Sequence, residues 1–142
     1  MLNVSTYLLF DGTCRQAMKF YQSCLGGELA VTEVAQSNMK SQMPAALHDK
    51  VLNARLTGGH LDISASDWMR ADQRPEPGNT MCLYITEGSH EELANIFAKL
   101  SDGAAVTDPL KQMWFGSYGA LNDRFGIRWM FHADAEPVPA PR

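Results

Sequence analysis

The chain has 142 residues, of which 45% are hydrophobic and 20% are charged, and its formal net charge is −4. This composition is typical of a globular protein long enough to bury a core. It has no cluster of Lys and Arg, no apolar run near the roughly 20 residues of a membrane span, and no signal-peptide pattern in residues 1–5. We therefore expect a cytoplasmic protein with no nucleic-acid or membrane partner.

The first half of the chain follows a strand–helix–strand pattern. Its elements are expected to be a strand over 2–10, a helix over 14–24, a strand over 28–35, and a loop with one helical turn over 36–49. Thr13 and Gln16 have the spacing of a capping box, and Gly26 with Gly27 would end the helix. The apolar face of this helix predicts packing against a sheet.

A β-hairpin is predicted next, because two alternating strands over 51–57 and 60–66 flank Gly58-Gly59. A two-residue glycine turn suits a tight hairpin and would fix its register. In that register Thr57 faces His60, Leu56 faces Leu61, Arg55 faces Asp62, and Asn53 faces Ser64. The apolar residues share one face and the polar residues the other, so Arg55 and Asp62 are expected to form a cross-strand ion pair.

A polar connector over 67–79 precedes a second copy of the pattern, displaced by 76 positions. Its elements are expected to be a strand over 80–86, a helix over 90–100 capped by Ser89, and strands over about 104–107, 116–121 and 127–133, with a loop around Pro109. The tail over 135–142 is expected to be disordered. The predicted fold class is α+β: one domain over 1–142 built from two βαβββ modules, about 1–72 and 78–134, whose curved mixed sheet has a cleft on its polar face.

Several stretches, taken in order, resemble one protein superfamily. They are Tyr7-Leu8, Phe10-x-Gly12-x-Cys14-x-x-Ala17-Met18-x-Phe20-Tyr21, Leu25-Gly26-Gly27, Met43-Pro44, Ser66-Asp67 and Trp114-x-Gly116-x-x-Gly119-x-Leu121-x-Asp123-Arg124-Phe125-Gly126-Ile127-x-Trp129. With the βαβββ repeat, they are similar to the vicinal oxygen chelate superfamily of glyoxalase I, bleomycin-resistance proteins and extradiol dioxygenases. Within it the chain resembles the PhnB-like, or demethylubiquinone methyltransferase-like, branch. The resemblance implies a glyoxalase-like fold for nearly the whole chain.

Metal-dependent members of that superfamily place a His or Glu on strands one, four, five and eight. The resemblance puts these residues at the four positions: Thr6 (or its neighbour Ser5), Asp62, Thr80 and Met130. Only Asp62 is a hard oxygen ligand, and Asn53 stands where the branch often has His. We therefore expect no metal and no cofactor. The alternative is a non-standard metal site at Asp62 and His60.

Other side chains leave two interpretations open. If Arg55 and Arg128 converge, they would hold an anionic group by forked hydrogen bonds; otherwise each pairs with a nearby carboxylate. Trp114, in a glycine-spaced loop with Phe115 and Tyr118, either walls an apolar ligand pocket or packs across a dimer interface. In the last strand Arg128, Met130 and His132 are expected on the cleft face, opposite the apolar side chains. The three cysteines are expected to be buried and unbridged.

Two functions follow from these observations. The first is a metal-free protein that binds a small molecule of unknown identity in a cleft between the modules, lined by Asn53, Arg55, Asp62, Ser64, Trp114 and Arg128. The second is a metal-dependent lyase, isomerase or dioxygenase with a non-standard site. The missing metal ligands favour the first. Exposed sheet edges also predict a homodimer.

Overall fold

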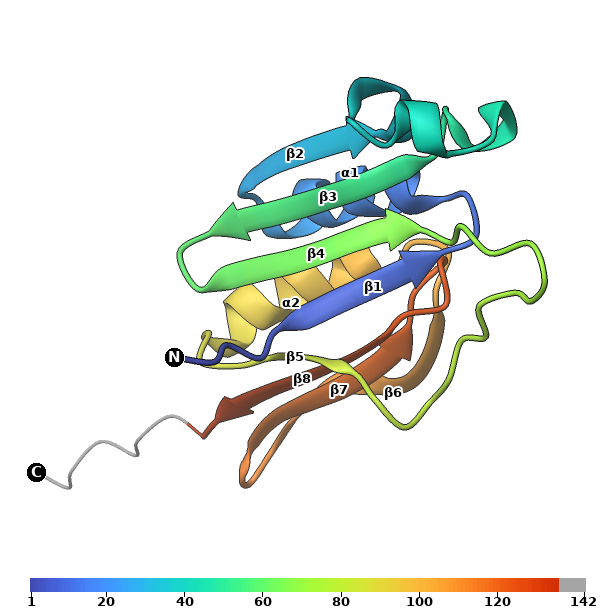
Figure 1. Ribbon diagram of the computed structural model, residues 1–142. Coiled ribbons are helices and arrows are strands. Elements are labelled where there is room, and N and C mark those ends of the chain that lie inside the picture. The colour runs from blue at the N-terminus through green and yellow to red at the C-terminus, as the bar shows by residue number, and fades with distance from the viewer. Residues whose placement is uncertain (136–142) are drawn as a thin grey trace, which may run out of the picture. The chain divides into compact units, whose positions relative to one another are not determined.

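The computed structural model describes residues 1–135. The chain divides into two compact units, and the division falls between Glu76 and Pro77. The first unit contains β1 (Thr6–Phe10), α1 (Cys14–Leu25), β2 (Glu28–Glu33), β3 (Val51–Gly58) and β4 (Leu61–Asp67) (Figure 1). The second contains β5 (Leu83–Ile85), α2 (His90–Leu100), β6 (Ala105–Met113), β7 (Gly116–Asn122) and β8 (Arg128–Asp134). Each unit is therefore a βαβββ module, as the sequence repeat predicted.

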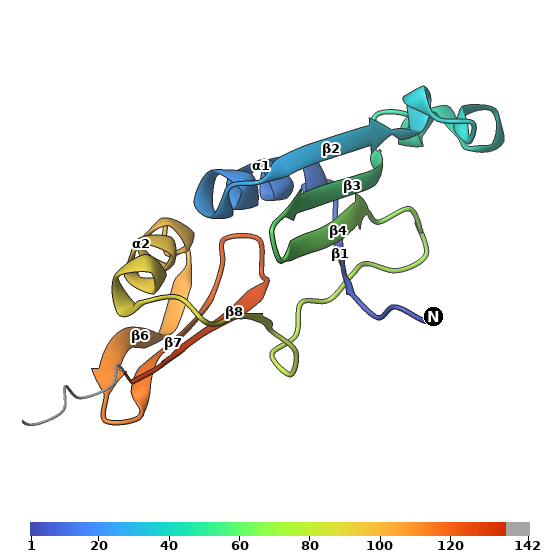
Figure 2. The same cartoon turned by 90° about the vertical axis from the view of Figure 1, so that its left-hand side faces the viewer.

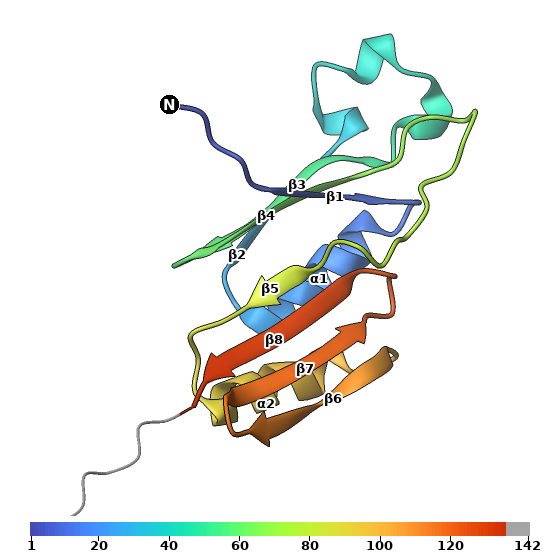
Figure 3. The same cartoon turned by 90° about the horizontal axis from the view of Figure 1, so that it is seen from below.

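The two units have the same sheet topology. The strand order is β1-β4-β3-β2 in the first sheet and β5-β8-β7-β6 in the second. In each sheet one outer pair, β1 with β4 or β5 with β8, is parallel, and the other pairs are antiparallel. One helix lies against one face of each sheet, so the other face is left open (Figure 3). These are the mixed sheets of the predicted α+β glyoxalase-like fold.

The helix-facing sides of the sheets form the cores, and strand parity decides which residues enter them. In the first unit the buried apolar residues of the hairpin are Ala54, Leu56, Ile63 and Ala65. In the second unit Trp129 and Phe131 are buried, and the ring of Phe131 lies edge-on to Phe97 of α2, with centroids 5.0 Å apart. The predicted alternation of buried and exposed residues in β3, β4 and β8 is therefore confirmed. Cys82, in contrast to Cys14 and Cys24, is exposed, so the expectation that all three cysteines are buried was wrong.

The hairpin turn lies one residue later than predicted. Gly59 and His60 form the turn, and Arg55 lies opposite Ser64 while Thr57 lies opposite Asp62. Gly59 has φ +56, which suits the first central position of a type II′ turn. Gly58 instead belongs to β3, where a Cβ would lie 3.1 Å from the Cα of Gly27, so it is glycine for close packing. Each residue of β3 is therefore paired with a residue of β4 two positions later than predicted. A shift of two keeps every side chain on its predicted face of the sheet, but the predicted directly opposed pairs are wrong.

Other boundaries differ for local reasons. The strand expected over 2–10 begins only at Thr6, and the loop over 36–49 contains 3-10 turns at Lys40–Gln42 and Ala45–Leu47, after a first turn at Val34–Gln36. This segment extends beyond the ends of β2 and β3 (Figure 2). β6 continues past Pro109 with two register shifts. Proline is tolerated there because β6 is an edge strand and bulges absorb the missing N–H.

The helix termini show one correct and one wrong capping prediction. Ser89 Oγ accepts a hydrogen bond of 3.1 Å from the backbone nitrogen of Glu92, as expected for α2. Thr13 makes no side-chain cap bond at α1; instead the backbone nitrogen of Cys14 donates to Asp67. Gly26 ends α1 with φ +77, as predicted. Among the described residues no helix is long and apolar enough to cross a membrane. The tail predicted to be disordered lies outside the described residues, apart from Ala135.

Candidate functional site

The open face of the first sheet carries four of the six residues that the sequence proposed as ligand contacts. Arg55 of β3 lies directly opposite Ser64 of β4. Asp62 lies two residues before Ser64 on β4, so its side chain is on the same face. Asn53 shares this face, although its partner is Thr32 of β2 rather than Ser64. The sheet therefore brings Asn53, Arg55, Asp62 and Ser64 together on one polar surface.

Arg55 and Asp62 form a forked ion pair on this surface. Arg55 Nε donates to Asp62 Oδ1 at 3.0 Å, and a second guanidinium nitrogen donates to Oδ2 at 2.8 Å. The long Arg side chain spans the diagonal between strands, which explains why the pair forms despite the shifted register. The hydrogen bond from Arg55 holds the pKa of Asp62 below its usual value. Both charges are therefore already neutralised by each other.

The donor set does not fit the metal site that the superfamily implies. Thr6 pairs with Ile63, which is buried, so the side chain of Thr6 lies on the helix-facing side of the sheet. The resemblance had implied a place for Thr6 on the open face. Thr80 lies outside β5, Met130 offers only a thioether, and Asp62 is bound by Arg55. Within residues 1–135, no three His, Cys, Asp or Glu side chains gather into a group that could hold a metal ion.

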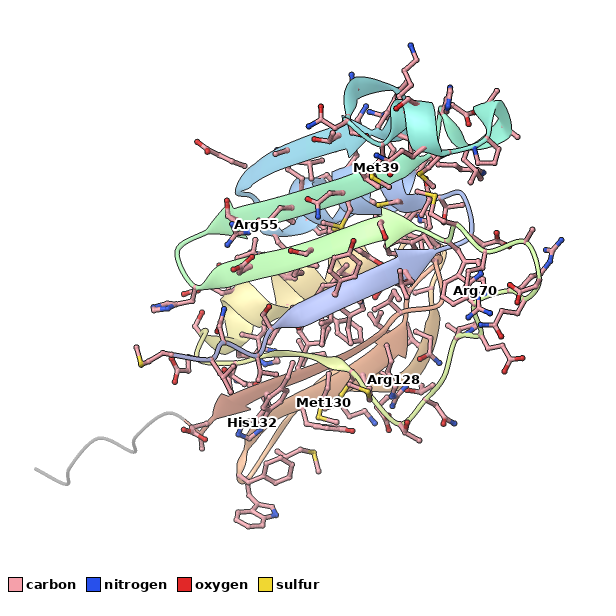
Figure 4. The ribbon with its side chains drawn as sticks, in the orientation of Figure 1. Met39, Arg55, Arg70, Arg128, Met130 and His132 are labelled. Atoms are coloured by element: carbon pink, nitrogen blue, oxygen red, sulfur yellow. The ribbon has the colours of Figure 1, made fainter. Side chains whose placement is uncertain are left out.

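Arg128 lies at the start of β8 on the open face of the second sheet and is held by three neighbours (Figure 4). One guanidinium nitrogen donates to Thr107 Oγ1 at 3.1 Å and to Asn122 Oδ1 at 3.3 Å, and another lies 3.7 Å from Asp108 Oδ2. Only 17% of its side chain is exposed. Arg128 therefore pairs with a nearby carboxylate, which is the second of the two interpretations that the sequence left open for it.

Trp114 and Arg128 are not brought together by the second sheet. Trp114 lies in the turn between Met113 and Gly116, and Gly116 is opposite Asp134 at the far end of β8. Asp134 and Arg128 are six strand positions apart, roughly 20 Å at about 3.3 Å per residue. Trp114 is 89% exposed, so it stands at the tip of a hairpin rather than in the wall of a closed pocket.

A connected row of rings occupies that end of the second sheet. The ring centroids of Trp114 and Phe115 are 5.5 Å apart, those of Phe115 and His132 are 6.4 Å apart, and those of His132 and Tyr84 are 6.5 Å apart. We call these four side chains the aromatic row. Met130 lies beside it on the same face, opposite Tyr84. The sequence named Trp114 and Phe115 as possible pocket walls and placed His132 on the cleft face, but it did not indicate Tyr84, since only the pairing of β5 with β8 places Tyr84 beside His132.

A cavity of about 330 Å³ lies at the start of α2, near the same end of the sheet. Its walls include His90, Gln112, Ser117 and Asp134. His90 Nδ1 and the buried hydroxyl of Ser117 are hydrogen-bonded at 2.6 Å, which ties the first turn of α2 to β7. This bond satisfies the buried hydroxyl, so the pair has a sufficient structural role.

Comparison with known proteins agrees with the fold. Residues 2–131 match the model of the family described as 3-demethylubiquinone-9 3-methyltransferase. The chain is 31% identical to protein PA1353 from Pseudomonas aeruginosa, with a TM-score of 0.83 over 96% of this chain and 100% of that one. It is 25% identical to a putative 3-demethylubiquinone-9 3-methyltransferase, PhnB protein, from Bacillus cereus, with a TM-score of 0.71 over 93% of this chain and 99% of that one.

A more distant structure shows the wider fold. A glyoxylase/bleomycin resistance protein/dioxygenase domain from Frankia is 20% identical, with a TM-score of 0.62 over 97% of this chain and 96% of that one. The repeated βαβββ topology and the match over residues 2–131 lead to the same conclusion. The chain belongs to the family described as 3-demethylubiquinone-9 3-methyltransferase, and its fold is that of glyoxalase/bleomycin resistance/dioxygenase proteins.

Proposed function

We propose that the protein binds a small molecule without a metal, and that the open face of the second sheet provides the main contacts. The observation that carries this proposal is the aromatic row, which presents Trp114 and Tyr84 to solvent at 89% and 57% exposure. Monomeric proteins seldom leave large apolar side chains grouped on a surface unless that surface binds something. Aromatic rings contribute large contact areas and stacking energy to such sites.

The metal-dependent alternative has less support from the side chains present. A divalent metal with positions open for a substrate needs several hard or imidazole ligands on one face. Asp62 is such a ligand, but Arg55 occupies both of its oxygens. His60, the other candidate, lies at the hairpin turn. The alternative of a metal-dependent lyase, isomerase or dioxygenase therefore has one candidate carboxylate, and that carboxylate is engaged by Arg55.

The family's description names a methyl transfer, and we do not extend that activity to this chain. Nucleotide cofactors commonly bind where a parallel strand ends in a glycine-rich turn before a helix. Here the turn between β1 and α1 has one glycine, Gly12, and both sheets are mixed rather than parallel. The described residues 1–135 therefore lack that glycine-rich turn after β1.

A thermal-shift screen of small aromatics, small carboxylic acids and divalent metals tests the proposal directly. A ligand that binds only the folded state raises the melting temperature in proportion to the logarithm of its concentration. We expect saturable stabilisation by at least one organic compound and none by nickel or manganese. When the responding compound is added, the protein's backbone NMR chemical shifts should change mainly in β5 and β8. Stabilisation by metals alone would contradict the proposal.

A further inference from the structure

The aromatic row has the geometry of a stacking platform. The ring planes of Phe115 and His132 are only 11° apart, and those of His132 and Tyr84 are 28° apart. Trp114 meets Phe115 edge-on at 89°, so it closes one end of the row. Aromatic rings with near-parallel planes favour offset stacking with a further flat ring.

The charged groups on the open faces do not compete for the ligand. Arg55 is held by Asp62, and Arg128 is held by Asp108, Thr107 and Asn122. An anion would have to compete with Asp62 for Arg55, and it would have to displace the partners of Arg128, whose side chain is only 17% exposed. The exposed carboxylate of Asp134 lies beside His132 at 3.2 Å and would repel an anion at the row itself.

The first sheet provides an internal comparison. Tyr7 of β1 and Tyr84 of β5 both lie on the outer, parallel-paired strand of their sheets, each opposite an open-face residue, Ser64 or Met130. Their exposures, 50% and 57%, are also similar. Yet in the described part of the chain Tyr7 stacks on no other ring, whereas Tyr84 stacks on His132. The platform is therefore a feature of the second unit and not of the repeat.

We propose that the ligand is a planar aromatic compound held by stacking on the aromatic row, rather than an anion held by arginine. This inference rests on the proposed function and specifies the chemical class of its ligand. A second copy of the chain is the competing occupant. A stable interface covers about 800 Å² per partner. The row consists of four rings, with Asp134 beside His132 and Arg128 farther along β8, and so small a cluster suits a compound of a few fused rings.

Three matched probes separate ring from charge: quinoline, quinoline-2-carboxylate and cyclohexanecarboxylate. Binding is measured at pH 8 by titration calorimetry and by quenching of Trp fluorescence. We expect quinoline to bind more tightly than quinoline-2-carboxylate, whose charge Asp134 repels, and cyclohexanecarboxylate not to bind, because stacking needs the ring and not the carboxylate. Tyr84→Ala and Phe115→Ala should each weaken quinoline at least about fivefold. Tyr7→Ala, the matched control, should leave its affinity unchanged.

Each contrary result has a distinct meaning. If the carboxylates bind best and Arg55→Ala or Arg128→Ala abolishes that binding, the inference is overturned while the proposed small-molecule function survives. If neither quinoline binds at millimolar concentration, the inference is also overturned, and the thermal-shift screen decides the proposed function separately. If Trp114→Ala changes the sedimentation of the protein and Tyr84→Ala leaves quinoline binding intact, the row is a contact between copies and the inference fails.

Discussion

The carboxylate of Asp67 lies 3.0 Å from the backbone nitrogen of Cys14, 53 positions earlier in the chain, and accepts its hydrogen bond at the start of α1. Its other oxygen accepts a bond of 2.8 Å from the backbone nitrogen of Val51. Asp67 is buried, with 4% exposure. One side chain therefore joins the end of β4 to the first residues of both α1 and β3.

Replacing Asp67 should be one of the most destabilising changes in the first unit. Asp67→Ala would leave the N–H groups of Cys14 and Val51 without acceptors in a buried place, at a cost of about 2–4 kcal/mol in the free energy of unfolding. Asp67→Asn keeps one acceptor oxygen and should cost less. Urea unfolding measures both, with Asp72→Ala, an exposed carboxylate paired with Arg70, as the control. A loss below about 0.5 kcal/mol for Asp67→Ala would contradict the structural role.

Asp67 also shows which part of the fold could not be predicted. Hydrophobic periodicity located both helices and all eight strands, because amphipathic spacing is written locally in the chain. The cap of α1 is not local: Thr13 has the right sequence spacing, but a charged acceptor from β4 replaces it. Likewise, the turn lies at Gly59-His60 and Gly58 packs against Gly27, which precedes β2, and no local pattern reveals this contact.

The candidate site was predictable to the extent that strand parity determines it. Parity placed Arg55, Asp62 and Ser64 on one face even though the register was wrong by two. It could not show that Arg128 is enclosed by Thr107 and Asn122, nor that Tyr84 stacks on His132, because these contacts depend on how strands pair. Such pairings join residues far apart in sequence.

No first-row divalent metal should bind tightly. The side chains at the four superfamily positions present one carboxylate, and that carboxylate is bound by Arg55. Ligand number and type dominate affinity for these ions. After dialysis against nickel or manganese, elemental analysis should find well under one equivalent per chain. One equivalent that disappears in Asp62→Ala would reverse this expectation and support the metal-dependent alternative.

A homodimer is expected from the exposed edges of the sheets. β2 and β6 are edge strands, and unpaired edges are commonly covered by another chain. Sedimentation velocity at high micromolar concentration should give the mass of two chains. Because we assign the aromatic row to a ligand, Trp114→Ala should leave this mass unchanged. A monomer at that concentration would rule out the dimer.

Cys14 and Cys82 should differ sharply in reactivity and in their effect on alkaline stability. Burial, reinforced by Asp67, raises the pKa of the Cys14 thiol from 9.0 to about 12, whereas Cys82 is exposed. A thiol reagent should therefore modify Cys82 quickly in the native protein and Cys14 only after unfolding.

The same shift predicts the direction of a pH effect. Above pH 9 the unfolded chain loses the Cys14 proton while the folded chain keeps it until about pH 12, so stability falls as pH rises through this window. Cys14→Ala should lessen the fall in melting temperature, and Cys82→Ala should not. Equal falls in both variants would mean that Cys14 ionises alike in the folded and unfolded states.

The last prediction isolates the pair on the open face of the first sheet. Arg55 lowers the pKa of Asp62 through its hydrogen bond, so Arg55→Ala should raise that pKa toward the ordinary aspartate value. Both side chains are more than a third exposed, and the melting temperature should change little. NMR titration of the carboxyl carbons below pH 6 measures the shift.

Asp72 is the matched control, because Arg70 lowers its pKa in the same way. Arg55→Ala should leave the titration of Asp72 unchanged, and Arg70→Ala should move Asp72 but not Asp62. For both carboxylates, the stabilisation from the pair is present at neutral pH and is lost as pH falls through the lowered pKa, since protonation removes the charge that the arginine binds. An Asp62 titration that is the same with and without Arg55 would show that the fork is not populated in solution. The Asp62 carboxylate would then be free to bind a ligand or a metal.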